Sequence, residues 1–180
     1  MSTLRPPDRR VLLLAALAAC AGALAWMAVE WVVRRRPSLL GLCSGVVAGL
    51  VAITPAAGYV TPKSAILIGV VAGVACYWGA TGLKRLLMAD DALDVFGVHA
   101  VGGMVGALMT GLLADPAIAG VRGDVWVQAI GVLAVGVYSA VMTGLLLGFS
   151  HMMVGLRVDE QSEQTGLDIA QHGEMLAPDS

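Results

Sequence analysis

The sequence predicts an all-α membrane protein, a polytopic helical bundle with five transmembrane helices. Hydrophobic residues make up 58% of the 180 residues and charged residues only 13%, and the mean hydropathy is +0.82. A soluble globular chain is nearer half apolar and a quarter charged. The apolar residues gather into five runs, each at least about as long as the ~20 residues that a helix needs to cross a bilayer. We expect spans at about 11–33, 38–60, 64–83, 95–114 and 126–156, so that 1–156 forms the transmembrane region and 157–180 a polar tail.

The first run, 11–33, follows a segment that contains three arginines and so resembles a signal peptide. Residues 17–20 even resemble a lipoprotein cleavage box. However, apolar sequence continues past this box, and Trp26, Glu30 and Trp31 suit the interfacial end of a membrane helix. We therefore predict that this run is the first transmembrane helix.

The second run, 38–60, follows the basic loop 34–36 and carries small residues at regular intervals. The glycines at four-residue spacing are Gly41, Gly45 and Gly49. Small residues at this spacing form a face on which another helix can pack closely. Pro55 interrupts the run near its far end and frees a backbone carbonyl, which a neighbouring helix or water must satisfy.

The third and fifth runs differ in length. The third, 64–83, repeats the small-residue spacing at Gly69 and Gly73. The fifth, 126–156, has over thirty residues, which is more than the hydrocarbon core of a bilayer requires. A helix of that length must tilt, kink or project beyond the membrane.

The fourth run, 95–114, contains a single titratable side chain, that of His99. An ionisable residue inside a membrane span is a functional-site hypothesis by default. Gly102, Gly103 and Gly106 follow at helical spacing, so an unbroken helix places them on the same face as the histidine. Because small residues let other helices approach, we expect His99 to point into a bundle. The alternative is a structural histidine that is hydrogen-bonded between helices.

Three carboxylates, those of Asp90, Asp91 and Asp94, stand just before the fourth run. Asp94 suits the start of a helix, where a carboxylate caps backbone N–H groups and interacts favourably with the helix dipole. We favour this structural role over a role in conduction. Asp90 and Asp91 either pair with basic loops or tail residues, or are solvated.

The remaining composition excludes several function classes. The net charge of −2 is small and dispersed, which argues against nucleic-acid binding. Cys20, Cys43 and Cys76 lie in apolar stretches without CxxC spacing, as expected of small packing residues. The sequence offers no activated nucleophile, metal-ligand cluster or phosphate-binding loop. We therefore predict no enzymatic activity, no cofactor and no metal site.

Positive charges in the short loops indicate the orientation, because such loops stay on the cytoplasmic side. The 34–36 and 84–85 segments and Arg157 lie on one side of the spans as drawn, and Lys63 and Arg122 on the other. We predict a multi-pass protein of the cell (inner) membrane with a cytoplasmic C-terminus. The N-terminal arginines disagree, because five spans place them outside. Either the first span inserts differently, or the chain has lost upstream spans that would orient it.

Several short motifs follow one another between residues 24 and 174. They are Trp26-Met27 with Glu30-Trp31, residues 37–41 running into 49–55, Lys84-Arg85, Asp90-Asp91, residues 94–99, residues 166–168 and residues 172–174. Together, and in this order, they resemble the C-terminal part of the ammonium transporter (Amt/Rh) family, closer to its microbial and plant branch.

The resemblance implies an all-helical protomer, usually of eleven spans, that assembles as a trimer with a narrow pore through each protomer. In this family two histidines touch within the pore, and ammonium is thought to give up its proton before crossing. His99 looks like the second of the pair, and the five spans look like the family's last five. The first histidine, the aromatic gate and the outer cation site belong to spans that this sequence lacks, so we expect the chain to be inactive alone. The residues that would have structural or regulatory roles near the pore are Asp90, Asp91, Asp94, Gly102 and Gly103.

The resemblance also gives the polar tail a role. In the family this tail packs against cytoplasmic loops and couples protomers, and PII-type signal proteins can close the pore from that side. The residues that match the family pattern, and so would make tail contacts, are Gly166, Asp168, His172 and Gly173. Plant members can be shut by phosphorylation of a threonine that is Ala170 here, so that switch should be absent. A second departure is Ala100, where the family usually has glycine.

Three functional interpretations follow. The chain is the C-terminal part of an ammonium channel, separated from the rest of its gene; or it is a subunit that completes a pore with a separately encoded N-terminal half. The third is a non-transporting membrane protein that binds a PII-type partner or joins trimers of a full-length transporter. In each, the expected partners are the lipid bilayer and either ammonium and ammonia or another transporter subunit.

Overall fold

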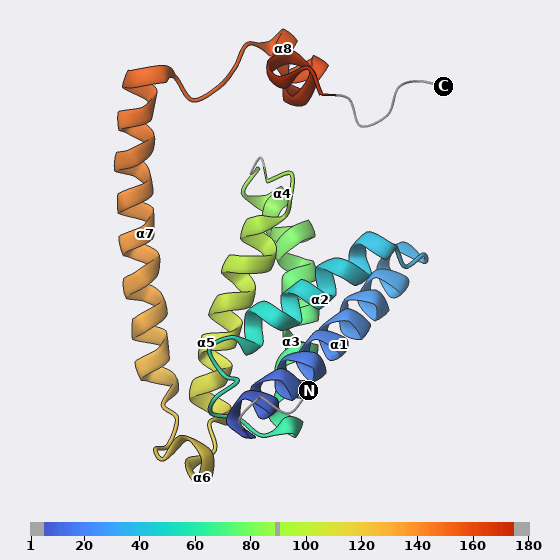
Figure 1. Cartoon of the computed structure of the whole chain (residues 1–180), viewed down its shortest axis with the longest axis vertical. Helices are drawn as coiled ribbons and strands as arrows, with labels where there is room; N and C mark the ends of the chain where they lie inside the picture. The colour runs from blue at the N-terminus through green and yellow to red at the C-terminus, as the bar shows by residue number, and fades with distance from the viewer. Residues whose placement is uncertain (1–5, 89–90, 175–180) are drawn as a thin grey trace. The chain divides into compact units, whose positions relative to one another are not determined.

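The computed structural model describes residues 6–88 and 91–174, and every regular element in that part of the chain is helical (Figure 1). Asp90 lies outside the described residues. The chain divides into two compact units, one up to Leu133 and one from Ala134. The division falls inside the last long helix.

Most of the long helices follow the predicted runs closely. The helices are α1 (Pro6–Arg34), α2 (Leu39–Ile53), α3 (Pro62–Trp78), α4 (Lys84–Leu86), α5 (Val101–Leu113), α6 (Pro116–Ala119), α7 (Val125–Val154) and α8 (Glu160–Thr165), with π-helical turns η1 (Gly79–Leu83), η2 (Phe96–Ala100) and η3 (Asp168–His172). The helices that are long and apolar enough to cross a membrane cover 9–34, 62–86, 96–113 and 125–154. The predicted all-α membrane fold is confirmed.

The second span differs from the prediction, because its helix ends at Ile53 and not near Val60. Pro55 has no N–H to donate to the carbonyl of Val51, and this carbonyl instead accepts the N–H of Thr54 at 3.3 Å. The chain then turns, and Val60 is fully buried. The apolar helix of this span therefore has 15 residues, and the rest of the run packs as a turn.

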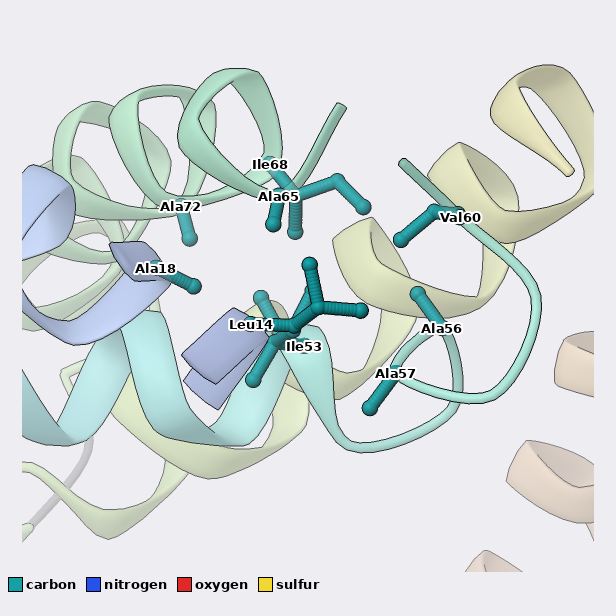
Figure 2. Packing of buried hydrophobic residues seen from close by; sticks show 10 residues of the cluster. Leu14, Ala18, Ile53, Ala56, Ala57, Val60, Ala65, Ile68 and Ala72 are labelled. Atoms are coloured by element: carbon teal, nitrogen blue, oxygen red, sulfur yellow. The ribbon is translucent and has the colours of Figure 1, made fainter. Parts of the chain in front are cut away.

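The core of the first unit consists mostly of small side chains, which allow the backbones of α1, α2 and α3 to approach closely. Figure 2 shows the buried cluster of Leu14, Ala18, Ile53, Ala56, Ala57, Val60, Ala65, Ile68 and Ala72. A Cβ atom added to Gly22 would lie 2.5 Å from the carbonyl oxygen of Gly45, and one added to Gly73 would lie 2.5 Å from that of Gly22. The predicted close-packing glycine faces are confirmed, because Gly45, Gly49, Gly69 and Gly73 are all buried against α1.

Glu30 connects α1 to α2 from a buried position. Only 2% of this residue is exposed, and its carboxylate accepts the N–H of Ser38 at 3.0 Å and the Ser38 hydroxyl at 3.1 Å. Arg34 donates to it at 3.3 Å, so the buried charge has both a counter-charge and hydrogen bonds. Trp26 is buried beside Glu30, whereas Trp31 is exposed. The position of these residues at the membrane interface stays a prediction.

Arg10, at the other end of α1, also contacts the neighbouring helix connection. Its Nη2 atom donates to the carbonyl of Val60 at 2.7 Å. The carbonyl of Tyr59, the residue before Val60, accepts the N–H of Asp115 at 2.9 Å. One of the N-terminal arginines therefore has a structural role in joining α1 to the turn that follows α2.

Candidate functional site

The candidate site begins where the chain enters the fourth span. The Asp91 carboxylate accepts the N–H groups of Val95 and Phe96, both at 2.9 Å, and so caps the start of this helix. Asp94 has a positive φ of 54° and its Oδ1 atom accepts a bond from Lys84 Nζ at 2.8 Å. The expected cap is thus provided by Asp91, and Asp94 joins the fourth span to the end of the third through an ion pair.

Two π-helical turns pack against each other beside this ion pair. A Cβ atom on Gly97 in η2 would lie 2.5 Å from the backbone nitrogen of Ala80 in η1, and one on Gly79 would lie 2.8 Å from the carbonyl oxygen of Gly97. The buried Cys76 thiol, at 3.6 Å, donates to the carbonyl of Val98. Direct backbone contact therefore fixes the position of η2, the turn that carries His99.

Gly79 and Gly97 are contact residues that no sequence pattern singles out. Both look like any other glycine of an apolar span, because a single sequence does not show which backbone lies opposite. Neither stands four residues from another glycine, so the small-residue spacing gave no indication either.

His99 does not lie on the face that the glycine spacing predicts. Gly102 is buried against Cys76 and Gly106 against the carbonyl of Ala52, whereas His99 is exposed and a Cβ on Gly103 would meet nothing within 4 Å. His99 lies in the π-helical turn η2, whose i→i+5 hydrogen bonding adds a residue to the turn and so changes its rotation relative to the glycines of α5. Gly103 is adjacent in the chain to the buried Gly102 and so faces another side of α5. The predicted face therefore includes Gly102 and Gly106 but excludes His99 and Gly103.

His99 lines a pocket of about 540 Å³ on the first unit. The other polar side chains that line it are those of Lys84 and Asp91. Its apolar lining comes from Leu87, Val95, Phe96 and Ala100. An imidazole in an apolar recess of this kind can present one hydrogen-bond donor and one acceptor to a small polar molecule when it is neutral.

The tail residues form a separate local structure in the second unit. Gly166 ends α8 with a φ of 94°, and Gly173 ends η3 with a φ of 68°, conformations that favour glycine. Within this turn the N–H of Glu174 donates to the carbonyl of Asp168 at 2.9 Å. The predicted tail residues, His172 included, therefore lie together, and their contacts with other loops stay a prediction.

The model of the Ammonium Transporter Family matches residues 2–177 of this chain. The ammonium transporter of Bacillus subtilis is 40% identical over 172 residues, which cover 91% of this chain and 43% of that protein. That of Aquifex aeolicus is 46% identical over 165 residues, or 88% of this chain and 39% of that protein.

Solved structures agree with these sequence matches. The crystal structure of Saccharomyces cerevisiae Mep2 matches with a TM-score of 0.81 and 36% identity, covering 92% of this chain and 40% of that one. A structure titled Sensor Amt Protein matches with a TM-score of 0.86 and 27% identity, covering 93% and 43%. The chain thus spans about two fifths of the length of the proteins that it matches.

Proposed function

Since the chain belongs to the ammonium transporter family, we propose that it supplies the C-terminal part of a pore that passes ammonium or ammonia across the cell membrane. The observation that carries this proposal is the exposure of His99 on an otherwise apolar span. An ionisable side chain that faced lipid would be costly, so a second set of helices should cover it. A segment equivalent to the part of the relatives that this chain does not match would cover His99.

The proposed chemistry follows from the cost of moving a cation through an apolar pore. Transferring an intact ion into such a medium costs tens of kcal/mol by Born estimates. Removing a proton from an amine whose pKa lies ~2–3 units above neutral costs only about 3–4 kcal/mol. The neutral molecule therefore crosses more easily. His99 would accept and donate hydrogen bonds along its path, together with a second histidine from the covering segment.

The acidic residues of the site serve this proposal as positioning groups. Asp91 caps the turn that carries His99, and the Asp94–Lys84 ion pair ties that turn to the preceding span. The chain spans about two fifths of its relatives' length and would supply only one of the two pore histidines. It should therefore conduct no ammonium by itself. Completion requires an N-terminal half, either fused or separately encoded.

We extend the proposal to the orientation and assembly of the chain. The basic segments 34–36 and 84–85 favour the cytoplasmic side of the membrane. Because four predicted spans follow the 34–36 segment, the tail returns to that same side. The bond from Arg10 to Val60 supports this arrangement, because an arginine that completes a helix connection is a structural residue and a weak topology signal. Assembly as a trimer and regulation of the tail by a PII-type protein complete the proposal.

The proposal is tested with a chimera in cells that lack their own ammonium transporters. The chain is expressed alone, and also fused behind the N-terminal part of the Bacillus subtilis transporter that it does not cover. We expect growth on low ammonium only for the fusion. His99→Asp in the fusion should impair uptake or change what passes, because a carboxylate cannot reproduce the donor–acceptor pair of neutral imidazole. His151→Ala, a change of an exposed histidine in α7, is the matched control.

Two outcomes would overturn the proposal. One is growth of cells that express the chain alone to the level reached with a full-length transporter. The other is a His99→Asp fusion that assembles with unchanged uptake and selectivity, which would make His99 a structural residue.

A further inference from the structure

We infer that the ion pair between Lys84 and Asp94 gates the pocket of His99. This inference rests on the proposed function and deepens it, because it names what regulates passage through the same pocket. While Lys84 is bound to Asp94, its side chain closes the pocket towards a second recess. When the pair breaks, the lysine side chain moves away and the two spaces join.

Lys84 stands between two recesses of the first unit. The pocket of His99 has a volume of about 540 Å³, and the second recess has a volume of about 420 Å³. Among the described residues, Lys84 is the one that lines both. The second recess lies where two helices end, because Arg34 of the last turn of α1 and Arg85 of α4 line it. A molecule that leaves the pocket of His99 on this side therefore passes the side chain of Lys84.

The partial burial of the ion pair suits a gate. Lys84 Nζ lies 2.8 Å from Oδ1 of Asp94, and the two side chains are 31% and 35% exposed. Fully exposed ion pairs contribute little to stability and hold neither partner firmly, whereas breaking a buried pair is strongly destabilising. A pair between these limits holds the lysine in place for most of the time and still opens at equilibrium.

The backbone of Asp94 couples the ion pair to the turn that carries His99. Its φ of 54° lies in the left-handed region, which residues other than glycine seldom adopt. Such a conformation persists only where the surroundings hold it. The carbonyl of Asp94 accepts the N–H of Val98 in η2 at 2.9 Å, and its carboxylate is held by Lys84. Release of the lysine therefore loosens the turn beside the pocket as well as removing the closure.

The charges around Lys84 favour a steric gate over an electrostatic filter. A filter would need a surplus positive charge at Lys84 to repel cations. The Asp94 carboxylate compensates that charge at contact distance, and the Asp91 carboxylate lines the same pocket. The fields of opposite charges this close together largely cancel at a third group. Lys84 therefore acts through its position and not through its charge.

Cysteine labelling measures access to the pocket without requiring conduction. The fusion described above carries His99→Cys as its one thiol, in inside-out membrane vesicles that expose the predicted cytoplasmic ends of α1 and α4. Two impermeant methanethiosulfonates, one cationic and one anionic, label it. We expect Lys84→Ala to raise both labelling rates about tenfold, as for a gate that is open about a tenth of the time. Asp94→Asn and Asp94→Gly, which tolerate the positive φ, should also raise both rates.

Two further variants serve as controls. Lys84→Arg keeps a cation that can pair with the Asp94 carboxylate, so both rates should stay within about twofold of the parent. Lys63→Ala removes a cation that lines neither recess and should leave both rates unchanged.

Unchanged labelling in Lys84→Ala, or in both Asp94 variants if the lysine variant fails to fold, overturns the inference. A faster cationic reaction together with a slower anionic one also overturns it, because Lys84 would then be a charge filter. Growth on low ammonium is scored separately in the fusion that retains His99. A fusion that folds but does not support growth counts against the proposed function alone, since the labelling rates still decide whether the gate exists.

Discussion

Glycines occur in two groups of apolar helices that differ in their surroundings. One group is α1, α2, α3 and α5, and the other is α7. In the first group a Cβ atom on Gly49, Gly69 or Gly106 would overlap a backbone carbonyl of a neighbouring helix. In α7, a Cβ on any glycine would meet nothing within 4 Å; these glycines are Gly131, Gly136, Gly144 and Gly148. No residue of α7 is buried.

The difference shows that small-residue spacing reports a capacity to pack, which is realised only when a partner is present. α1, α2 and α3 find their partners within the described chain, and their glycines are therefore in contact. Within their own units, the glycines of α7 have no helix packed on them.

A bulky residue in place of one glycine of α2 and of one glycine of α7 tests this difference most directly. Gly49→Leu should prevent the chain alone from folding into a single species, because the side chain would strike the Ala18 carbonyl at a cost above about 3 kcal/mol. Gly144→Leu should change the free energy of unfolding by less than about 0.5 kcal/mol. Thermal unfolding and size-exclusion profiles in detergent measure both. Equal damage from the two substitutions would show that α7 is packed as tightly as α2.

Substituting alanine for a packed and for an unpacked glycine tests the same difference within the fourth span. Gly97→Ala places a Cβ 2.5 Å from the Ala80 nitrogen and should push η1 and η2 apart, at about 1–3 kcal/mol. Gly103→Ala, four residues after His99, adds its methyl group in open space and should leave the melting temperature of the chain alone unchanged. In the fusion described above, Gly97→Ala should also lower ammonium uptake, because it displaces His99.

The measurements for this pair are the melting temperature of the chain and the uptake of the fusion. A Gly97→Ala chain that melts like the parent would mean that the contact between the π-helical turns yields without cost. Loss of uptake in Gly103→Ala without a change in the melting temperature would place the covering segment of the pore against Gly103.

The smallest expected effect concerns the polar tail, where charge and not packing holds the local structure. Hydrogen bonds from the backbone and hydroxyl of Ser162 lower the pKa of Asp159, and the bond from Arg157 lowers the pKa of Glu163. A carboxyl whose pKa is lowered on folding stabilises the fold above its ordinary pKa, and this contribution is lost as the pH falls through the lowered value. The first turn of α8 should therefore loosen below about pH 4 while the glycine-packed core is unaffected.

NMR of the full chain in detergent micelles checks this prediction through the amide signal of Ser162. The signal should move as the pH falls below about 4, and Asp159→Asn should abolish that movement. An Asp159→Asn chain with the parent titration would show that the cap does not hold α8.

Much of the fold was predictable because apolar runs and glycine spacing determine it directly. Apart from the second span, whose helix stops at Ile53, the long helices begin and end within about five residues of the predicted limits, and Gly45 and Gly69 lie on the faces expected of them. The site was less predictable. The π-helical turn η2 depends on the backbone of η1, which no local sequence pattern encodes, and it moves His99 off the glycine face.

The backbone contacts between these helices also have a genetic consequence. In a core of side chains, a residue that becomes too large can be rescued when its neighbour mutates to a smaller one. A side chain added at Gly49 or Gly69 would meet the main-chain carbonyl of Ala18, and one at Gly106 would meet that of Ala52. Every amino acid has that carbonyl. Second-site suppressors of lesions at these glycines should therefore not arise at the contacted residues, and the usual route back is reversion at the mutated codon itself.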